Sequence, residues 1–254
     1  MSEGDNTSVY IYNGVDRVPN DVTHVRVDPS VSVIPAEAFR FQQKLELVEL
    51  PEGLIRIENN AFYNCSALKK INIPSTLTDI GREAFFNCNR LEEIVLPGRL
   101  RSIGGWAFSN CGLRTINIPP NVERIGRAAF LSCESLTDII FSEGLQEIEK
   151  DAFSRCTSLV SVTLPSSLRV IGQESFEGCK LLNEVHMPDT IESIQARAFK
   201  NCNFTNFRMP PSSVGNGVDI SIVGSNSCLV SLELPESVEQ LKTNIIEQKK
   251  IAQI

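Results

Sequence analysis

Apolar residues recur along this chain with a fixed period. Eight phenylalanines lie 22 or 23 residues apart, and each follows an alanine except one, which follows Ser175. These are Phe39, Phe62, Phe85, Phe108, Phe130, Phe153, Phe176 and Phe199. From Phe62 onward a cysteine stands three residues after each, at Cys65, Cys88, Cys111, Cys133, Cys156, Cys179 and Cys202. A repeat of this length indicates stacked copies of one structural unit, because a single copy cannot bury its apolar face alone.

A second apolar segment separates the phenylalanines and predicts a strand in each unit. It reads L-x-x-I-x-I-P, as in Leu68 to Pro74. Alternate side chains of such a segment point to opposite faces, so the apolar residues point inward and those between them outward. The proline cannot donate to a ladder and ends the strand. We expect ten strands paired in parallel along one axis, around Val25, Val48, Ile71, Ile94, Ile116, Ile139, Val162, Val185, Phe207 and Leu232.

The remaining parts of the unit are expected to be turns. An apolar pair such as Leu77 and Ile80 follows the proline in each unit. In A-F-x-x-C-x-x-L the three-residue spacing places Phe, Cys and Leu on one side of a short helical turn. The unit therefore reads L-x-x-I-x-I-P-x-x-L-x-x-I-G-x-x-A-F-x-x-C-x-x.

This repeat resembles the leucine-rich repeat subclass of the bacterial surface antigen BspA and related treponemal proteins, which is also abundant in some protists and microalgae. The resemblance covers roughly Val22 to Leu241. It implies a right-handed, horseshoe-shaped solenoid of about ten units, with a parallel β-sheet on one face and short helical turns on the other. It also implies interaction or adhesion roles, the latter in secreted members.

Both ends of the repeat array depart from the pattern, as terminal repeats do. We expect an N-terminal cap over residues 1–21, with a strand at Val9 to Tyr12, and regular repeats over residues 22–209. Residues 210–254 are expected to hold a degenerate repeat with a surface loop, Pro210 to Leu229, and a C-terminal cap. In that cap Ile245-Ile246 takes the Ala-Phe place and Lys249 the Cys place.

Charge narrows the classes of partner. The net charge of -7 and the pI near 5.1 argue against nucleic acid and anionic membrane surfaces, which require clustered Lys and Arg. The polar N-terminus resembles no secretion signal, which predicts a cytoplasmic monomer with free thiols.

No group of residues indicates catalysis, a metal or a cofactor. The regular cysteines fit core packing, and Cys228, out of register, is the candidate reactive thiol. His24 and His186 fall at outward strand positions, expected to face solvent, seven strands apart and too distant to share a metal. The turn glycines form no phosphate-binding motif. Trp106, expected to be exposed, is weak evidence of a contact. We therefore expect no enzymatic activity.

Outward strand positions are free to encode a partner, since inward ones must repeat to keep the core stacked. In the middle repeats these positions are small and weakly charged, with two aliphatic residues among them: Val95, Thr115, Asn117, Ile140, Ser161 and Thr163. An apolar centre with a polar rim is typical of an interface, although any solvated sheet looks mixed. The prediction is an interaction scaffold that binds a protein partner of unknown identity through this face. The alternative is an adhesin or surface-recognition protein exported by a non-standard route.

Overall fold

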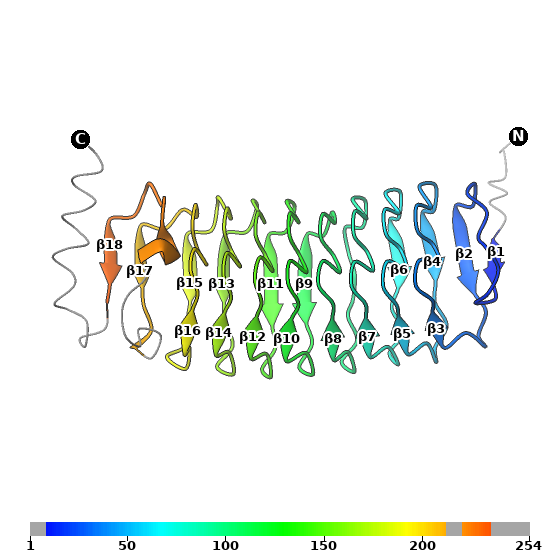
Figure 1. The fold of residues 1–254 in the computed structure, drawn as a ribbon, viewed down its shortest axis with the longest axis horizontal. Coiled ribbons are helices and arrows are strands. Elements are labelled where there is room, and N and C mark those ends of the chain that lie inside the picture. The colour runs from blue at the N-terminus through cyan, green and yellow to red at the C-terminus, as the bar shows by residue number, and fades with distance from the viewer. Residues whose placement is uncertain (1–8, 212–219, 235–254) are drawn as a thin grey trace, which may run out of the picture.

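The computed structural model describes residues 9–211 and 220–234. The chain winds through about nine turns, which lie side by side in an elongated stack (Figure 1). We call each turn a coil and number the coils from the leucine position of the repeat. Coils 1 to 8 span residues 22–44, 45–67, 68–90, 91–112, 113–135, 136–158, 159–181 and 182–203. The predicted repeat solenoid with parallel strands is confirmed.

The first sheet contains the predicted strands and is interrupted. Its strands are β1 (Tyr10–Tyr12), β2 (His24–Val27), β4 (Leu47–Glu49), β6 (Lys70–Asn72), β9 (Thr115–Ile118), β11 (Asp138–Phe141), β13 (Ser161–Thr163), β15 (Glu184–His186), β17 (Asn206–Arg208) and β18 (Ser231–Glu233). Parallel pairing joins β1-β2-β4-β6, β9-β11, β13-β15 and β17-β18. The strand predicted at Ile94 is absent, so that prediction was wrong.

Two of the interruptions lie beside shortened coils. Coils 4 and 8 have one residue fewer after their cysteine, at Cys111-Gly112-Leu113 and Cys202-Asn203-Phe204. The chain therefore enters β9 and β17 one residue early, and each of these strands lacks a ladder to the preceding coil. The break between β11 and β13 follows a full-length coil, and nothing in the sequence explains it.

A second sheet of two-residue strands was not predicted. Its eight strands are β3 (Val33–Ile34), β5 (Arg56–Ile57), β7 (Asp79–Ile80), β8 (Ser102–Ile103), β10 (Arg124–Ile125), β12 (Glu147–Ile148), β14 (Val170–Ile171) and β16 (Ser193–Ile194). They pair in parallel in chain order, and the sheet that they form extends along the stack (Figure 1). Each consists of the second residue of the apolar pair that follows the proline, such as Ile80, and the residue before it. The core thus lies between two sheets.

The segment expected to form helical turns contains successive tight turns instead. Within coil 1 the amides of Ala38, Arg40 and Gln42 donate to carbonyls three residues earlier. The amides of Glu37, Phe39 and Phe41 donate to coil 2, at distances of 2.8 to 3.1 Å. Two residues per coil have positive φ, as at Glu37 and Phe41, and this reverses the direction of alternate peptides. Besides the ladders of the two sheets, the turn side therefore contributes a third set of hydrogen bonds between coils. The described part of this side contains no α-helix.

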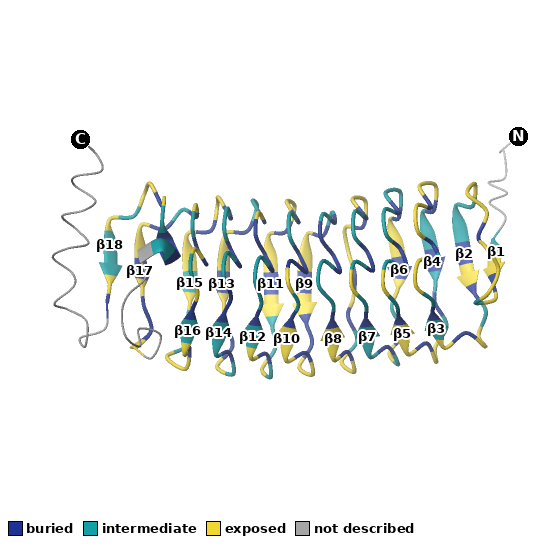
Figure 2. Ribbon diagram, viewed as in Figure 1, coloured by how far each residue is buried: buried dark blue, intermediate teal, exposed yellow. Residues whose placement is uncertain are grey.

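The phenylalanines form one continuous stack through the core. From Phe39 to Phe199 the rings are fully buried, and successive centroids lie 4.9 to 5.3 Å apart. Tyr12 closes the stack at the N-terminal end, with its ring 4.9 Å from that of Phe39. Figure 2 shows buried residues along the interior of the stack and exposed ones on strands such as β9. The predicted core column is confirmed.

The seven cysteines of the repeat column are buried, as expected, and they also donate hydrogen bonds. Each thiol of the column contacts the carbonyl oxygen of the phenylalanine in the preceding coil, for example Cys65 to Phe39 at 2.9 Å and Cys133 to Phe108 at 3.1 Å. All eight cysteines are free, and Cys228 is exposed. Burial raises the pKa of Cys65 and Cys179 to about 12.

The degenerate repeat retains the plan of the others with different residues. Ile222, in the 3-10 helix η2 (Ile220–Val223), accepts the hydrogen bond from the amide of Phe199 that an alanine, or in one coil Ser175, accepts elsewhere. Buried Asn226 takes the cysteine place and donates to the carbonyl of Phe199 at 2.9 Å. At the other end, strand β1 pairs in parallel with β2. Residues 212–219 of the predicted loop, and Ile245, Ile246 and Lys249, lie outside the described residues.

Candidate partner-binding surface

All six residues of the predicted surface point outward from the first sheet. Thr115 and Asn117 lie on β9, Ile140 on β11, and Ser161 and Thr163 on β13. Val95 lies in the segment of coil 4 that forms no strand. Val95 is 82% exposed and Ile140 is 63% exposed, and both stand among the polar residues of this face. The structure therefore places these residues together on one face.

Equivalent outward positions of successive coils form two rows along the face, and strand register fixes these rows within two pairs of coils. Row A comprises Glu93, Thr115, Asp138, Ser161 and Glu184, and row B comprises Val95, Asn117, Ile140, Thr163 and His186. The pairing of Thr115 with Asp138 and of Asn117 with Ile140 fixes the rows across β9 and β11. The pairing of Ser161 with Glu184 and of Thr163 with His186 fixes them across β13 and β15. Each coil thus contributes one residue to each row.

The polar side chains of the central coils have unused hydrogen-bonding groups. Within the described part of the chain, the side chains of Thr115, Asn117, Ser161 and Thr163 make no hydrogen bond to protein. Asn72, which stands in the same column in coil 3, is fully engaged instead. Its amide both donates to and accepts from the backbone of Leu50, each at 2.8 Å. The central face therefore offers donors and acceptors that the fold itself does not use.

Carboxylates outnumber cations beside these groups. Among described residues, Glu93 and Asp138 form no ion pair, although Asp138 accepts a hydrogen bond from Thr137 at 2.6 Å. Arg114 of the same region is paired with Glu92 at 2.8 Å. The central face is therefore acidic as well as partly apolar.

At the N-terminal end of the face, two side chains hydrogen-bond to the carboxylate of Glu49. Glu49 accepts from His24 Nε2 at 2.7 Å and from Arg26 Nε at 2.6 Å. The hydrogen bond from Arg26 lowers the pKa of Glu49. The His24 side chain is only 16% exposed, so the expectation that it faces solvent was wrong, whereas His186 is 60% exposed and lies 3.2 Å from Glu184. Sequence spacing could not reveal the cross-strand partner of His24.

A hollow of about 990 Å³ adjoins Val95 on the first sheet. It lies over β4, β6 and residues 90–95, and its lining includes Leu47, Lys70, Glu93 and Val95. The hollow coincides with the missing strand, because residues 91–97 do not pair with β6. It is therefore an extension of the same face.

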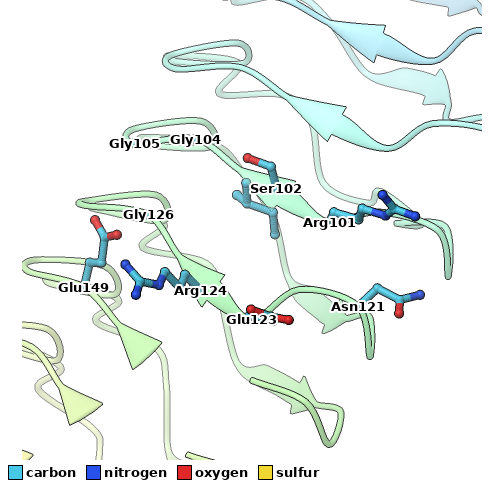
Figure 3. A pocket seen from close by; sticks show the side chains of 10 residues that line it. Arg101, Ser102, Gly104, Gly105, Asn121, Glu123, Arg124, Gly126 and Glu149 are labelled. Atoms are coloured by element: carbon cyan, nitrogen blue, oxygen red, sulfur yellow. The ribbon is translucent and has the colours of Figure 1, made fainter. Parts of the chain in front are cut away.

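Another hollow, of about 690 Å³, lies on the second sheet (Figure 3). Arg101, Asn121, Arg124 and Glu149 project into it from three successive coils. Figure 3 shows Arg101 and Asn121 on one side of this surface and Arg124 and Glu149 on the other. Among the residues that the structure describes, there is no group of three or more His, Cys, Asp or Glu side chains placed to hold a metal ion, and no helix long and apolar enough to cross a membrane.

Aromatic residues on the turn side were partly missed from the sequence. Trp106 is half-buried between two guanidinium groups, with Arg82 4.5 Å and Arg127 5.1 Å from its ring centroid. The expectation that it is a free surface aromatic was therefore wrong. Tyr63 and Phe86 stack at 4.9 Å beside Phe41, which is 50% exposed. Phe41, Tyr63 and Phe86 fall at variable positions of the repeat, so only their aromatic character could have indicated the cluster.

Comparison with known proteins gives a consistent family assignment. The family model described as BspA type leucine-rich repeat region, in six copies, matches residues 19–137 and 107–218. A leucine-rich repeat protein from Bacteroides ovatus is 27% identical, with a TM-score of 0.73 over 93% of this chain and 71% of that one. The leucine-rich repeat protein of T. pallidum is 34% identical, with a TM-score of 0.59 over 61% of this chain and 75% of that one.

A search of curated proteins finds no match. Repeat proteins of this type are typically protein-interaction or surface-recognition molecules. The family model covers well over half of the chain, in the repeats that build both sheets. The chain belongs to the BspA-type leucine-rich repeat family.

Proposed function

We propose that this protein is a non-catalytic interaction scaffold that binds a protein partner through the first sheet. The binding surface comprises Val95, Thr115, Asn117, Ile140, Ser161 and Thr163. The observation that carries the proposal is that two strongly exposed aliphatic side chains lie among four polar side chains without protein hydrogen bonds. Such a surface gains most from a partner, because burying the aliphatic groups is favourable and the polar groups are available to bond.

The arrangement of the rest of the molecule supports this choice of face. Inward residues are fixed by the ring stack and the cysteine column, so changes there disturb every neighbouring coil. The turn side is bound between coils by backbone hydrogen bonds, and several of its charged side chains pair with one another, as Lys150 does with Glu174 at 3.1 Å. A net charge of -7 supports a protein partner over nucleic acid.

Partner capture from the source cell tests the proposal. The variant Val95→Glu/Ile140→Glu/Thr163→Lys should lose the partner that the wild-type chain captures. Its circular dichroism and melting temperature should barely shift, because surface substitutions typically change stability by within about 0.5 kcal/mol each. Ile55→Glu is the matched control, since Ile55 is a 44% exposed aliphatic residue next to strand β5 of the second sheet. Capture retained by the triple variant would place binding on another surface.

A further inference from the structure

We propose that the partner presents a basic amphipathic α-helix that lies along rows A and B, parallel to the axis of the stack. This inference rests on the proposed function of the face and names the chemistry of its occupant. It starts from an alternation between successive coils. Coils 4 and 6 expose a carboxylate beside an aliphatic residue, Glu93 with Val95 and Asp138 with Ile140. Coils 5 and 7 expose only uncharged polar residues at the same places.

The spacing of this alternation matches the α-helix. Successive core rings across coils 4, 5 and 6 are 5.3 Å and 5.1 Å apart, and paired strands lie about 4.8 Å apart, so two coils advance by about 10 Å. Seven residues of an α-helix advance by about 10.5 Å and return to nearly the same side of the helix. Apolar residues seven apart on the helix would therefore meet Val95 and Ile140 in turn. The helical turn between them would meet Asn117, and the next would meet Thr163, both with side chains free to hydrogen-bond.

A β-strand fits the same rows poorly. Side chains on one side of a β-strand recur about every 6.6 to 6.8 Å, which coincides with neither one coil nor two. Those of a polyproline II helix recur about every 9.3 Å, close to two coils, so the helicity of the bound peptide distinguishes it from an α-helix. A helix satisfies its own backbone groups and therefore needs no backbone hydrogen bonds from the surface.

The charge of the face indicates that the partner helix is basic. Over coils 4 to 8, rows A and B hold three carboxylates, Glu93, Asp138 and Glu184, each two coils from the next, and no lysine or arginine. Glu93 and Asp138 form no ion pair with any described residue. Lysine or arginine beside each apolar position of the helix, on the flank that faces row A, would neutralise them. The predicted partner segment thus repeats an apolar and a basic residue every seven positions.

An unbiased peptide selection tests this chemistry without knowledge of the natural partner. The full chain is used to select from a displayed library of random peptides of about 20 residues, long enough for a helix of about 30 Å. Selected peptides are synthesised, and their affinities are measured against the wild-type chain and its variants. Helicity on binding is followed by circular dichroism of the complex. The expected peptides carry apolar residues seven apart with flanking lysine or arginine, and become helical when bound.

Two double variants separate the contribution of the aliphatic residues from that of the carboxylates. Val95→Ser/Ile140→Ser should weaken the selected peptides by about tenfold or more, and so should Glu93→Gln/Asp138→Asn, the latter chiefly at low salt. Ile55→Glu and Glu123→Lys, which change exposed residues beside the second sheet, should leave the affinity unchanged. Peptides that need the face but bind in an extended form, or are acidic, would overturn the helix and leave the proposed function intact. Absence of any peptide sensitive to the face variants would also overturn the inference, and the triple-variant capture experiment then decides the proposed function separately.

Discussion

At the scale of single residues, the cysteine position of the repeat requires a hydrogen-bond donor as well as a small volume. Each thiol of the column donates to a phenylalanine carbonyl of the preceding coil, as Cys156 does to Phe130 at 3.3 Å. At the two ends the same place holds amides, Gln42 and Asn226, whose nitrogen atoms donate to backbone carbonyls at 2.9 Å. Periodicity predicted that the column is buried, but cysteine resembles an apolar residue in sequence, so its donor role was not predicted.

Replacing Ser175 with alanine should stabilise the protein. Ser175 occupies the alanine place before Phe176, is fully buried, and its hydroxyl has no hydrogen-bond partner among the described residues. Removing an unsatisfied buried hydroxyl should raise the free energy of unfolding by about 1 kcal/mol. Chemical denaturation measures this change. Ser154→Ala is the control and should destabilise, because the Ser154 hydroxyl donates to the Glu177 carbonyl at 3.2 Å.

Truncating a ring in the middle of the stack should cost far more than a change on the face. Phe130 is fully buried, with ring centroids of Phe108 and Phe153 at 5.3 and 5.1 Å. Phe130→Ala should lower the free energy of unfolding by about 3 to 5 kcal/mol. Thr163→Ala, at an exposed position without a protein hydrogen bond, should change it by less than about 0.5 kcal/mol. Similar losses in urea denaturation would contradict the inside-outside assignment.

At the scale of elements, strands of the first sheet were predictable because they alternate over three or more residues. The strands of the second sheet have two residues each, too few for alternation to be seen, so the sequence showed only the apolar pair. The prediction of a helical turn was wrong because three-residue spacing also fits successive tight turns. Those turns need positive φ at Glu37, Trp106 and Arg155, residue types that do not usually signal it.

The shortened end of coil 4 should tolerate only glycine at position 112. A Cβ atom there would lie 2.3 Å from the backbone oxygen of Asn89, closer than real Cβ atoms approach backbone. Gly112→Ala should therefore lower the free energy of unfolding by about 1 to 3 kcal/mol. Gly98→Ala is the matched control, since nothing lies within 4 Å of its Cβ position and its φ is ordinary. Equal melting temperatures for the two variants would show that coil 4 relaxes freely.

The candidate surface was predicted as outward positions, and the structure adds what surrounds them. Alternation in the sequence sufficed to place Val95, Ile140 and Thr163 outside. It could not show which polar groups already have partners, because those partners come from a coil about 23 residues away. Asn72 and Asn117 look alike in sequence, yet only Asn72 is bonded to a neighbouring coil. Binding at this face stays a prediction.

At the scale of the whole molecule, the thiol column makes stability depend on alkaline pH. Burial raises the pKa of Cys65 and Cys179 from 9.0 to about 12. Between these values the unfolded chain releases protons that the folded chain retains, so the free energy of unfolding falls as pH rises. The expected slope is about 1.4 kcal/mol per pH unit for each thiol, and the contribution is complete below about pH 8.

Urea denaturation at several pH values between 7.5 and 10.5 measures this slope. Cys179→Ala should be less stable at neutral pH, because it loses the bond to the Phe153 carbonyl, but should show a shallower decline. Thiol labelling provides an independent check. Native protein should react rapidly at Cys228 alone, and all eight thiols should react after unfolding without reductant. A pH-independent midpoint would contradict burial of the column.

The two-coil alternation of the sheet face constrains how such a chain can lengthen or shorten. The core residues are nearly the same in every coil, so gain or loss of a single 23-residue unit leaves the stack intact. On the face, however, one added unit would set an acidic coil against another or separate them by two neutral ones. Gene duplications that copy two units together preserve both the stack and the face. Relatives that share the partner should therefore differ in length by about 46 residues in this region, whereas relatives that differ by about 23 should have changed partners.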